Sequence, residues 1–239
     1  MTIGLDLTLI TIDPVSGRAR FGPAVAYALA VGELLDLALL GRVELRDDHL
    51  IVQYKGPVGE PLLEQALIRL AEAQSAPPTV SQWVAERGPW RIDAYIAGLE
   101  EAGALRLVPT GSRAGGKRIE VLDTLRIHGA VERLSNAIAG GDSLPYEEQA
   151  FAALTAAAGC ARDHLRGWDH RADRKQLRDL SRSACRNNDG DAVARTILRQ
   201  GIQTLRTLAK HAGASSRTID QQIGLTQTGW WASGDNLPP

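Results

Sequence analysis

The residues of this sequence that could bind an anion are arginines and lysines gathered in four short stretches. These are residues 18–21, 90–91 and 110–118 and the row 171–186. Arginine side chains beside aromatic rings or glycine-rich backbone suit phosphate, because guanidinium groups and backbone N–H groups donate to its oxygens. Phosphate-bearing ligands are therefore the first class of partner to consider.

The first two stretches combine arginine with an aromatic residue. Arg20 and Phe21 precede a long apolar segment, and Trp90 and Arg91 begin another expected helix. If the two pairs meet in the folded chain, they form a pocket suited to a phosphorylated headgroup. The sequence therefore gives a candidate headgroup site of Arg20, Phe21, Trp90 and Arg91.

The other two stretches are basic without aromatic residues. The segment 110–118 reads T-G-S-R-A-G-G-K-R, and its Arg113, Lys117 and Arg118 could touch an anionic surface, although such glycines also suit an ordinary hairpin turn. Residues 162–186 contain eight cationic residues and four aspartates. This spacing fits either a solvated, salt-bridged helix face, which the mixed signs favour, or an anionic partner. The members of the row are Arg171, Arg174, Lys175, Arg178, Arg182 and Arg186.

No catalytic motif accompanies these cations. The sequence lacks G-x-S-x-G, a phosphate loop, H-E-x-x-H and C-x-x-C. Cys160, His164, His170 and Asp173 come nearest to a metal site, but their spacing matches no zinc motif. We therefore expect a protein that is not an enzyme and that has no metal and no cofactor.

The composition sets further bounds on function. The chain has 239 residues, 44% of them hydrophobic, a net charge of −1 and two cysteines. A chain of this length can bury a sizeable hydrophobic core. Two cysteines are too few for a disulfide framework. The near-neutral charge argues against general attraction to nucleic acid, and the N-terminus lacks a secretory pattern. We expect a cytoplasmic protein, peripheral at the inner face of a membrane if it binds lipid.

One apolar segment organises the expected fold. Residues 24–40 are apolar on every side, which predicts a buried helix, and Glu33 and Asp36 near its middle argue against a membrane span. Gly41 is the expected left-handed cap. The period-two pattern of residues 43–52 around Asp47 and Asp48 then predicts a β-hairpin.

The remaining patterns are mostly helical. We expect a strand or short helix at 5–12, a helix at 62–74, a helix capped near residue 79, a new helix from Arg91 after Pro89, and a second hairpin within 105–121. Helices fill the chain from residue 123 to about 211. The predicted fold is mainly α, a core helical bundle wrapped by amphipathic helices with one or two small β-hairpins, in one domain over 1–212 followed by a tail over 213–239.

Four motifs in this order resemble the Golgi phosphoprotein 3 family. They are L-L-D-L-A-L-L-G-R-V at 34–43, L-L-E-Q-A-L at 62–67, V-S-Q-W-V at 80–84 and L-E-E-A-G-A-L at 99–105. The resemblance extends over about residues 5–208. It implies a non-catalytic helical protein that, in eukaryotic members, binds phosphatidylinositol 4-phosphate on Golgi membranes and helps to sort glycosyltransferases.

The resemblance also implies where a headgroup would bind. The family's headgroup tryptophan falls at Phe21, its first arginine at Ala30, and its paired arginines at Pro89 and Ile92, with Arg91 as the nearby replacement. The family's hairpin tip carries bulky apolar residues, whereas this one is basic and glycine-rich. Such a tip suits electrostatic contact at a lipid surface.

Two functions remain as the main hypotheses, and an enzyme that uses the cysteine–histidine cluster is a third and weaker one. In the first, the protein is a peripheral adaptor that binds an anionic phospholipid membrane, with a possible protein client. In the second, residues 83–121 form a winged-helix DNA-binding module, whose wing is suitably basic. Asp93, Glu100 and Glu101 weaken the second, because acids on the recognition helix repel phosphates. Nucleic acid is therefore not the expected partner.

Overall fold

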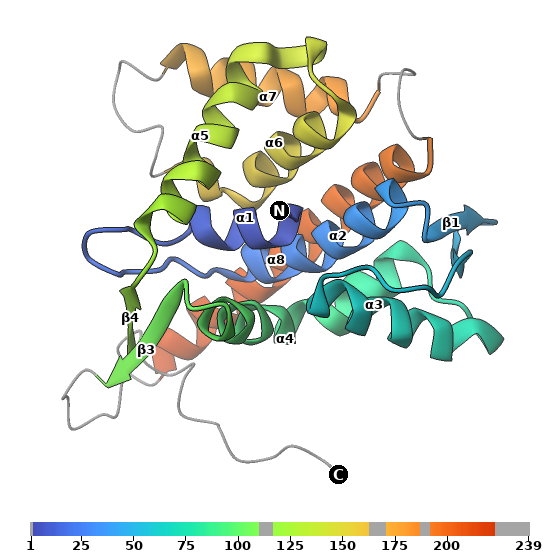
Figure 1. Ribbon diagram of the computed structural model, residues 1–239, viewed down its shortest axis with the longest axis horizontal. Helices are drawn as coiled ribbons and strands as arrows, with labels where there is room; N and C mark the ends of the chain where they lie inside the picture. The colour runs from blue at the N-terminus through green and yellow to red at the C-terminus, as the bar shows by residue number, and fades with distance from the viewer. Residues whose placement is uncertain (1, 110–116, 163–170, 187–191, 223–239) are drawn as a thin grey trace.

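The computed structural model describes residues 2–109, 117–162, 171–186 and 192–222, with side chains up to residue 212 (Figure 1). The elements are α1 (Ile3–Ile10), α2 (Pro23–Leu39), β1 (Val43–Arg46), β2 (His49–Val52), α3 (Pro61–Glu72), α4 (Val80–Glu101), β3 (Leu105–Pro109), β4 (Lys117–Val121), α5 (Thr124–Gly140), α6 (Tyr146–Ala158), α7 (Arg171–Ala184) and α8 (Ala192–Gln222). The strands pair as two antiparallel hairpins, β1 with β2 and β3 with β4. The predicted mainly α fold is confirmed.

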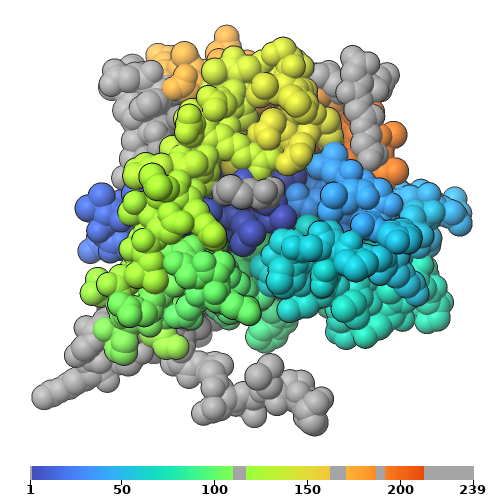
Figure 2. Space-filling model, in the orientation of Figure 1, coloured from blue at the N-terminus to red at the C-terminus, as the bar shows by residue number. Residues whose placement is uncertain are grey.

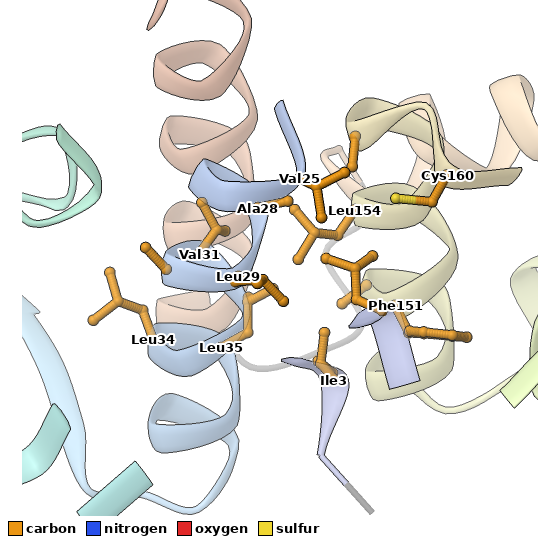
Figure 3. Packing of buried hydrophobic residues seen from close by; sticks show 14 of the residues in the cluster. Ile3, Val25, Ala28, Leu29, Val31, Leu34, Leu35, Phe151, Leu154 and Cys160 are labelled. Carbon is orange, nitrogen blue, oxygen red and sulfur yellow. The ribbon is translucent and has the colours of Figure 1, made fainter. Parts of the chain in front are cut away.

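Helix α2 is the buried centre that the sequence predicts. Thirteen of its seventeen residues are buried, and α1, α4, α6 and α8 pack around it. Figure 3 shows Leu29 and Leu35 facing Phe151 and Leu154 of α6, with Ile3 of α1 beside them. A helix that is apolar on all sides is stable only when other elements cover every side, as they do here.

Local signals set the end of α2 and the turn after it. Gly41 has φ +65°, as predicted for a left-handed cap, and the N–H of Arg42 donates to the carbonyl of Leu37 at 2.8 Å. Asp47 and Asp48 also have positive φ, which a tight two-residue hairpin turn requires. The first hairpin is therefore confirmed.

The segment before α2 contains a short helix and a turn. The sequence left a strand or a short helix open at 5–12, and the structure contains α1 there, capped by Thr2. The turn that follows packs against the second hairpin, because a Cβ added to Gly17 would lie 1.9 Å from the carbonyl oxygen of Ile119. This close approach brings two distant parts of the sequence to one end of the molecule.

Helix α4 differs from the prediction. We expected Pro89 to separate two helices, but one helix runs from Val80 to Glu101 with Pro89 inside it. Gly88 precedes the proline and has no Cβ to clash with the ring, so the helical conformation costs less there than usual. Helix α4 also packs extensively on α2, and tertiary packing of this kind overrides a local break.

Substituting Gly88 with alanine is expected to lower the free energy of unfolding by about 1 to 3 kcal/mol, as overpacking does. The new Cβ would lie 2.2 Å from the ring of Tyr27 and 3.2 Å from its Cα. Gly129→Ala in α5 is the control, since no atom lies within 4 Å of its added Cβ, and it should stabilise slightly. Urea denaturation measures both. Equal stability of the two variants would contradict the tight α2–α4 contact.

The last helix is longer than expected. The sequence predicted an end near His211, whereas α8 continues to Gln222. Its middle packs on α2, where Gly201 lies against Val31. Within the described residues, no helix combines the length and the apolar character needed to cross a bilayer.

Candidate functional site

The predicted headgroup residue Arg91 lies in the interior of the protein. It is 5% exposed and forms an ion pair with Glu33, whose side chain is fully buried in α2. The Nε of Arg87 lies 3.3 Å from the other carboxylate oxygen of Glu33. The sequence identifies Glu33 as an acid within an apolar helix, but it does not reveal the partners of Glu33. These partners belong to α4, more than fifty residues later in the chain.

The electrostatics of this buried trio follow from desolvation. Burial raises the pKa of the Glu33 carboxyl, and the guanidinium groups of Arg91 and Arg87 oppose that shift. Burial lowers the pKa of Arg87, opposed by the charge of Glu33. Each charge is thus tolerated because the other is present.

A cavity of about 520 Å³ lies beside this trio, between α3 and α4. Helix α3 and the turn after it contribute an arginine–glutamate pair and small apolar residues, and α4 contributes two tryptophans, two arginines and a glutamate. The lining residues are Arg69, Glu72, Ala73, Ala76, Pro78, Trp83, Glu86, Arg87, Trp90 and Arg91. The cavity is thus rich in cationic and aromatic side chains.

This cavity contains only half of the predicted headgroup set. Trp90 and Arg91 line it, and Trp90 is 75% exposed. Arg20 and Phe21 are not among the lining residues: Arg20 is exposed, and Phe21 packs partly buried against the core. The residues that sequence reasoning missed are Arg69, Trp83 and Arg87. The i, i+4 spacing of Trp83 and Arg87 was the available signal.

The family's headgroup positions lie elsewhere. Ala30 is fully buried in α2, and neither Pro89 nor Ile92 lines the cavity. Apart from Arg91, which the resemblance gives only as a nearby replacement, the α3–α4 cavity is therefore built from residues other than those that the family resemblance assigns to a headgroup.

The second hairpin carries the other predicted contact residues. Lys117 and Arg118 are exposed on β4, opposite Pro109 and Val108 of β3. Arg113 lies outside the described residues. The expected antiparallel pairing of the hairpin is therefore present in the described residues.

Large apolar side chains are exposed near this hairpin. Val15, at the turn that contacts β4, is 96% exposed, and Leu122 and Leu125, where β4 leads into α5, are 52% and 79% exposed. In Figures 1 and 2 the loop before α2 and the start of α5 adjoin at the left edge. We call this region the hairpin end and define it by Val15, Arg18, Arg20, Lys117, Arg118, Leu122 and Leu125.

The basic row of α7 lies on the side of the molecule away from β3 and β4 (Figure 1). Most of its cations are exposed, and Arg182 pairs with Asp179 at 3.2 Å. In the cysteine–histidine cluster, Cys160 is buried, while His164 and His170 lie outside the described residues. Within the part of the chain that the structure describes, three potential metal ligands do not gather anywhere.

Comparison with known proteins agrees with this architecture. The model of the family described as Golgi phosphoprotein 3 (GPP34) matches residues 3–202, which include α1 through the first eleven residues of α8. None of the curated proteins compared with the chain matches it significantly. Since the family match covers most of the sequence and ends within the last core helix, the chain belongs to the Golgi phosphoprotein 3 family.

Proposed function

We propose that this protein is a non-enzymatic peripheral adaptor that binds anionic phospholipid membranes through the hairpin end. The observation that carries the proposal is the joint exposure of cationic and large apolar side chains where the turn before α2 packs against β4. Family membership supports it, because eukaryotic relatives act at membranes. An exposed patch that mixes arginine, lysine and leucine is typical of a surface that rests in a lipid interface.

Each kind of side chain has a physical role at a membrane. A lysine or arginine near an anionic leaflet contributes about 1 kcal/mol of attraction. Burial of Val15, Leu122 and Leu125 among lipid chains adds the free energy of removing apolar surface from water. The two terms together favour attachment without a membrane-spanning helix.

The acids at this end already have local partners. The Asp13 carboxylate accepts hydrogen bonds from the N–H groups of Val15 and Ser16. These hydrogen bonds lower the pKa of Asp13, and the bond from Ser16 has the largest effect. Glu120 pairs with Arg106 at 2.7 Å. Asp123 caps α5 by accepting from its first N–H groups. The carboxylates are therefore engaged in turns, caps and pairs.

Arg20 belongs to the hairpin end, and the proposal places its neighbour Phe21 at the rim. By family resemblance, the headgroup would be phosphatidylinositol 4-phosphate. With Ala30 buried and uncharged, recognition here depends on Arg20 and on the general charge of the lipid surface. We therefore expect vesicles of phosphatidylserine to bind nearly as well as those containing phosphatidylinositol 4-phosphate at equal surface charge.

Reversing the charge of Lys117 and Arg118 together, to glutamate, should weaken sedimentation with phosphatidylserine vesicles at least tenfold at low salt. The matched control reverses Lys175 and Arg178 on α7, which lies away from the hairpin. This control should retain most of the binding. Equal losses in the two double variants, or no dependence on acidic lipid, would contradict binding through the hairpin end.

A second variant tests the apolar contact. Leu125→Ser removes an exposed leucine and should not affect folding, yet it should reduce vesicle binding several-fold at high salt, where the charges are screened.

A gel-shift with duplex DNA at low salt tests the alternative hypothesis of a winged-helix DNA-binding module. Asp93, Glu100 and Glu101 are exposed on α4, so we expect no shift.

A further inference from the structure

We infer that the cavity between α3 and α4 is a binding site for a phosphate-type oxyanion, distinct from the hairpin end. The inference does not depend on membrane binding, since it concerns other residues. Its basis is a set of buried hydrogen-bond donors and one positive charge in excess at the inner wall, where Arg87 and Arg91 share the single carboxylate of Glu33.

The donors are on α4. Trp83 is 4% exposed, and its indole N–H has no acceptor within hydrogen-bond distance in the described part of the chain. The Nη2 of Arg87 is also buried and lacks an acceptor there. The guanidinium of Arg87 lies over the Trp83 ring at 4.7 Å, so the two side chains are held together. A buried donor without an acceptor is costly, and an oxygen-rich ligand relieves that cost.

The charges near these donors favour an anion over a cation. Glu33 neutralises one of the two guanidinium groups of Arg87 and Arg91, which leaves one positive charge at the inner wall. At the rim, Arg69 pairs with Glu72 at 3.3 Å. Glu86 is the remaining acid of the lining. An oxyanion of low charge therefore fits the inner wall, and Glu86 opposes it.

The size of the cavity indicates more than a bare ion. A volume of about 520 Å³ is within the range of small-molecule sites. Trp90 at the rim exposes a flat apolar face that suits the organic part of a ligand. The site thus fits a phosphorylated small molecule, whose phosphate reaches Arg87 and Trp83. That phosphate could belong to a soluble metabolite or to a lipid headgroup.

The test is a titration of the uniformly ¹⁵N-labelled full chain with sodium phosphate, against sodium chloride of equal ionic strength. Loss of one indole signal in Trp83→Phe identifies the Trp83 resonance. Phosphate should shift that resonance saturably, and chloride should not. A parallel titration with vesicles containing phosphatidylinositol 4-phosphate separates the sources. Displacement of phosphate by these vesicles indicates a lipid headgroup, and its retention indicates a soluble ligand.

Three variants make the result specific. Arg87→Gln should weaken phosphate binding about tenfold, the loss expected for a charge-assisted hydrogen bond. Glu86→Gln should strengthen it two- to fivefold, because it removes a negative charge from the rim. Glu86 is exposed, so this variant should fold normally. Arg178→Gln on α7 is the control and should leave the affinity unchanged.

Two outcomes would overturn the inference: no saturable shift of the Trp83 resonance, or a Glu86→Gln variant that binds phosphate no better than the unmodified protein. Neither outcome bears on vesicle binding through Lys117 and Arg118. Conversely, loss of membrane binding in the hairpin variants with normal phosphate affinity would leave the cavity site intact. The two proposals therefore fail independently.

Discussion

Replacing Glu33 with leucine is expected to destabilise the protein by about 3 to 5 kcal/mol, the usual effect of removing one member of a buried ion pair. The carboxylate is fully buried and pairs with both Arg87 and Arg91. Without the Glu33 carboxylate, Arg91 keeps its positive charge although its side chain is only 7% exposed. Arg87, with 14% of its side chain exposed, is better placed to turn toward solvent. Urea denaturation measures the loss.

The double variant Glu33→Leu with Arg91→Leu tests the cause. If the unpaired charge is responsible, removing it should recover a large part of the lost stability, because buried ion pairs are often replaceable by apolar residues. Glu86→Gln, on the exposed side of α4, is the matched control and should change stability by less than about 0.5 kcal/mol. A double variant as unstable as Glu33→Leu would mean that leucine simply does not fit in α2.

Stability should fall as pH rises from about 4 to 7, contrary to the behaviour of carboxylates that pair at a protein surface. Burial raises the pKa of Asp36 from its ordinary 3.8 to about 7, outweighing the hydrogen bond from the N–H of Ile3. Burial likewise raises the pKa of Glu33 and of Asp6, against the opposing effects of their arginine partners. The folded state therefore holds more protons than the unfolded state across this window.

The sign follows from which pKa is higher. A group whose pKa is raised on folding stabilises the protein below its unfolded pKa, and this contribution is lost as pH rises through the folded pKa. For Asp36 the shift of about three units corresponds to roughly 4 kcal/mol.

Asp36→Asn provides the control for this prediction. The amide keeps an oxygen that accepts from Ile3, whose N–H lies 3.1 Å from Asp36 Oδ2, but it does not titrate. Urea denaturation at pH 5 and pH 8 should therefore show a smaller loss of stability for the variant than for the unmodified protein. Parallel curves for the two proteins would show that Asp36 is ionised throughout, and would contradict the raised pKa.

These effects connect the candidate site to the core. Glu33 belongs to α2, the central helix, yet its partners Arg87 and Arg91 line the α3–α4 cavity. An anion that attracts Arg87 competes with Glu33 for the same guanidinium. Phosphate should consequently reduce the destabilisation caused by Glu33→Leu, since it replaces the missing negative charge. Urea denaturation with and without phosphate can therefore be applied both to the Glu33 variants and to the cavity variants.

Elements whose signals lie in adjacent residues were predictable from the sequence. The apolar run of α2, its glycine stop at Gly41 and the turn at Asp47 and Asp48 depend on local conformational preference, and all are present. The family motifs are also contiguous, and the family match confirms them. These features require no knowledge of what packs against them.

The tertiary structure alone decided which distant residues meet. Pro89 is a local break, but the packing of α4 on α2 keeps the helix continuous. Glu33 had no visible partner, because its arginines lie more than fifty positions later. The sequence left open whether Arg20 and Phe21 meet Arg91, and the residues that line the cavity beside Arg91 come from α3, α4 and the turn between them. Sequence periodicity shows which face of a helix is buried, whereas the choice of partner depends on how helices cross, and only the folded chain specifies that.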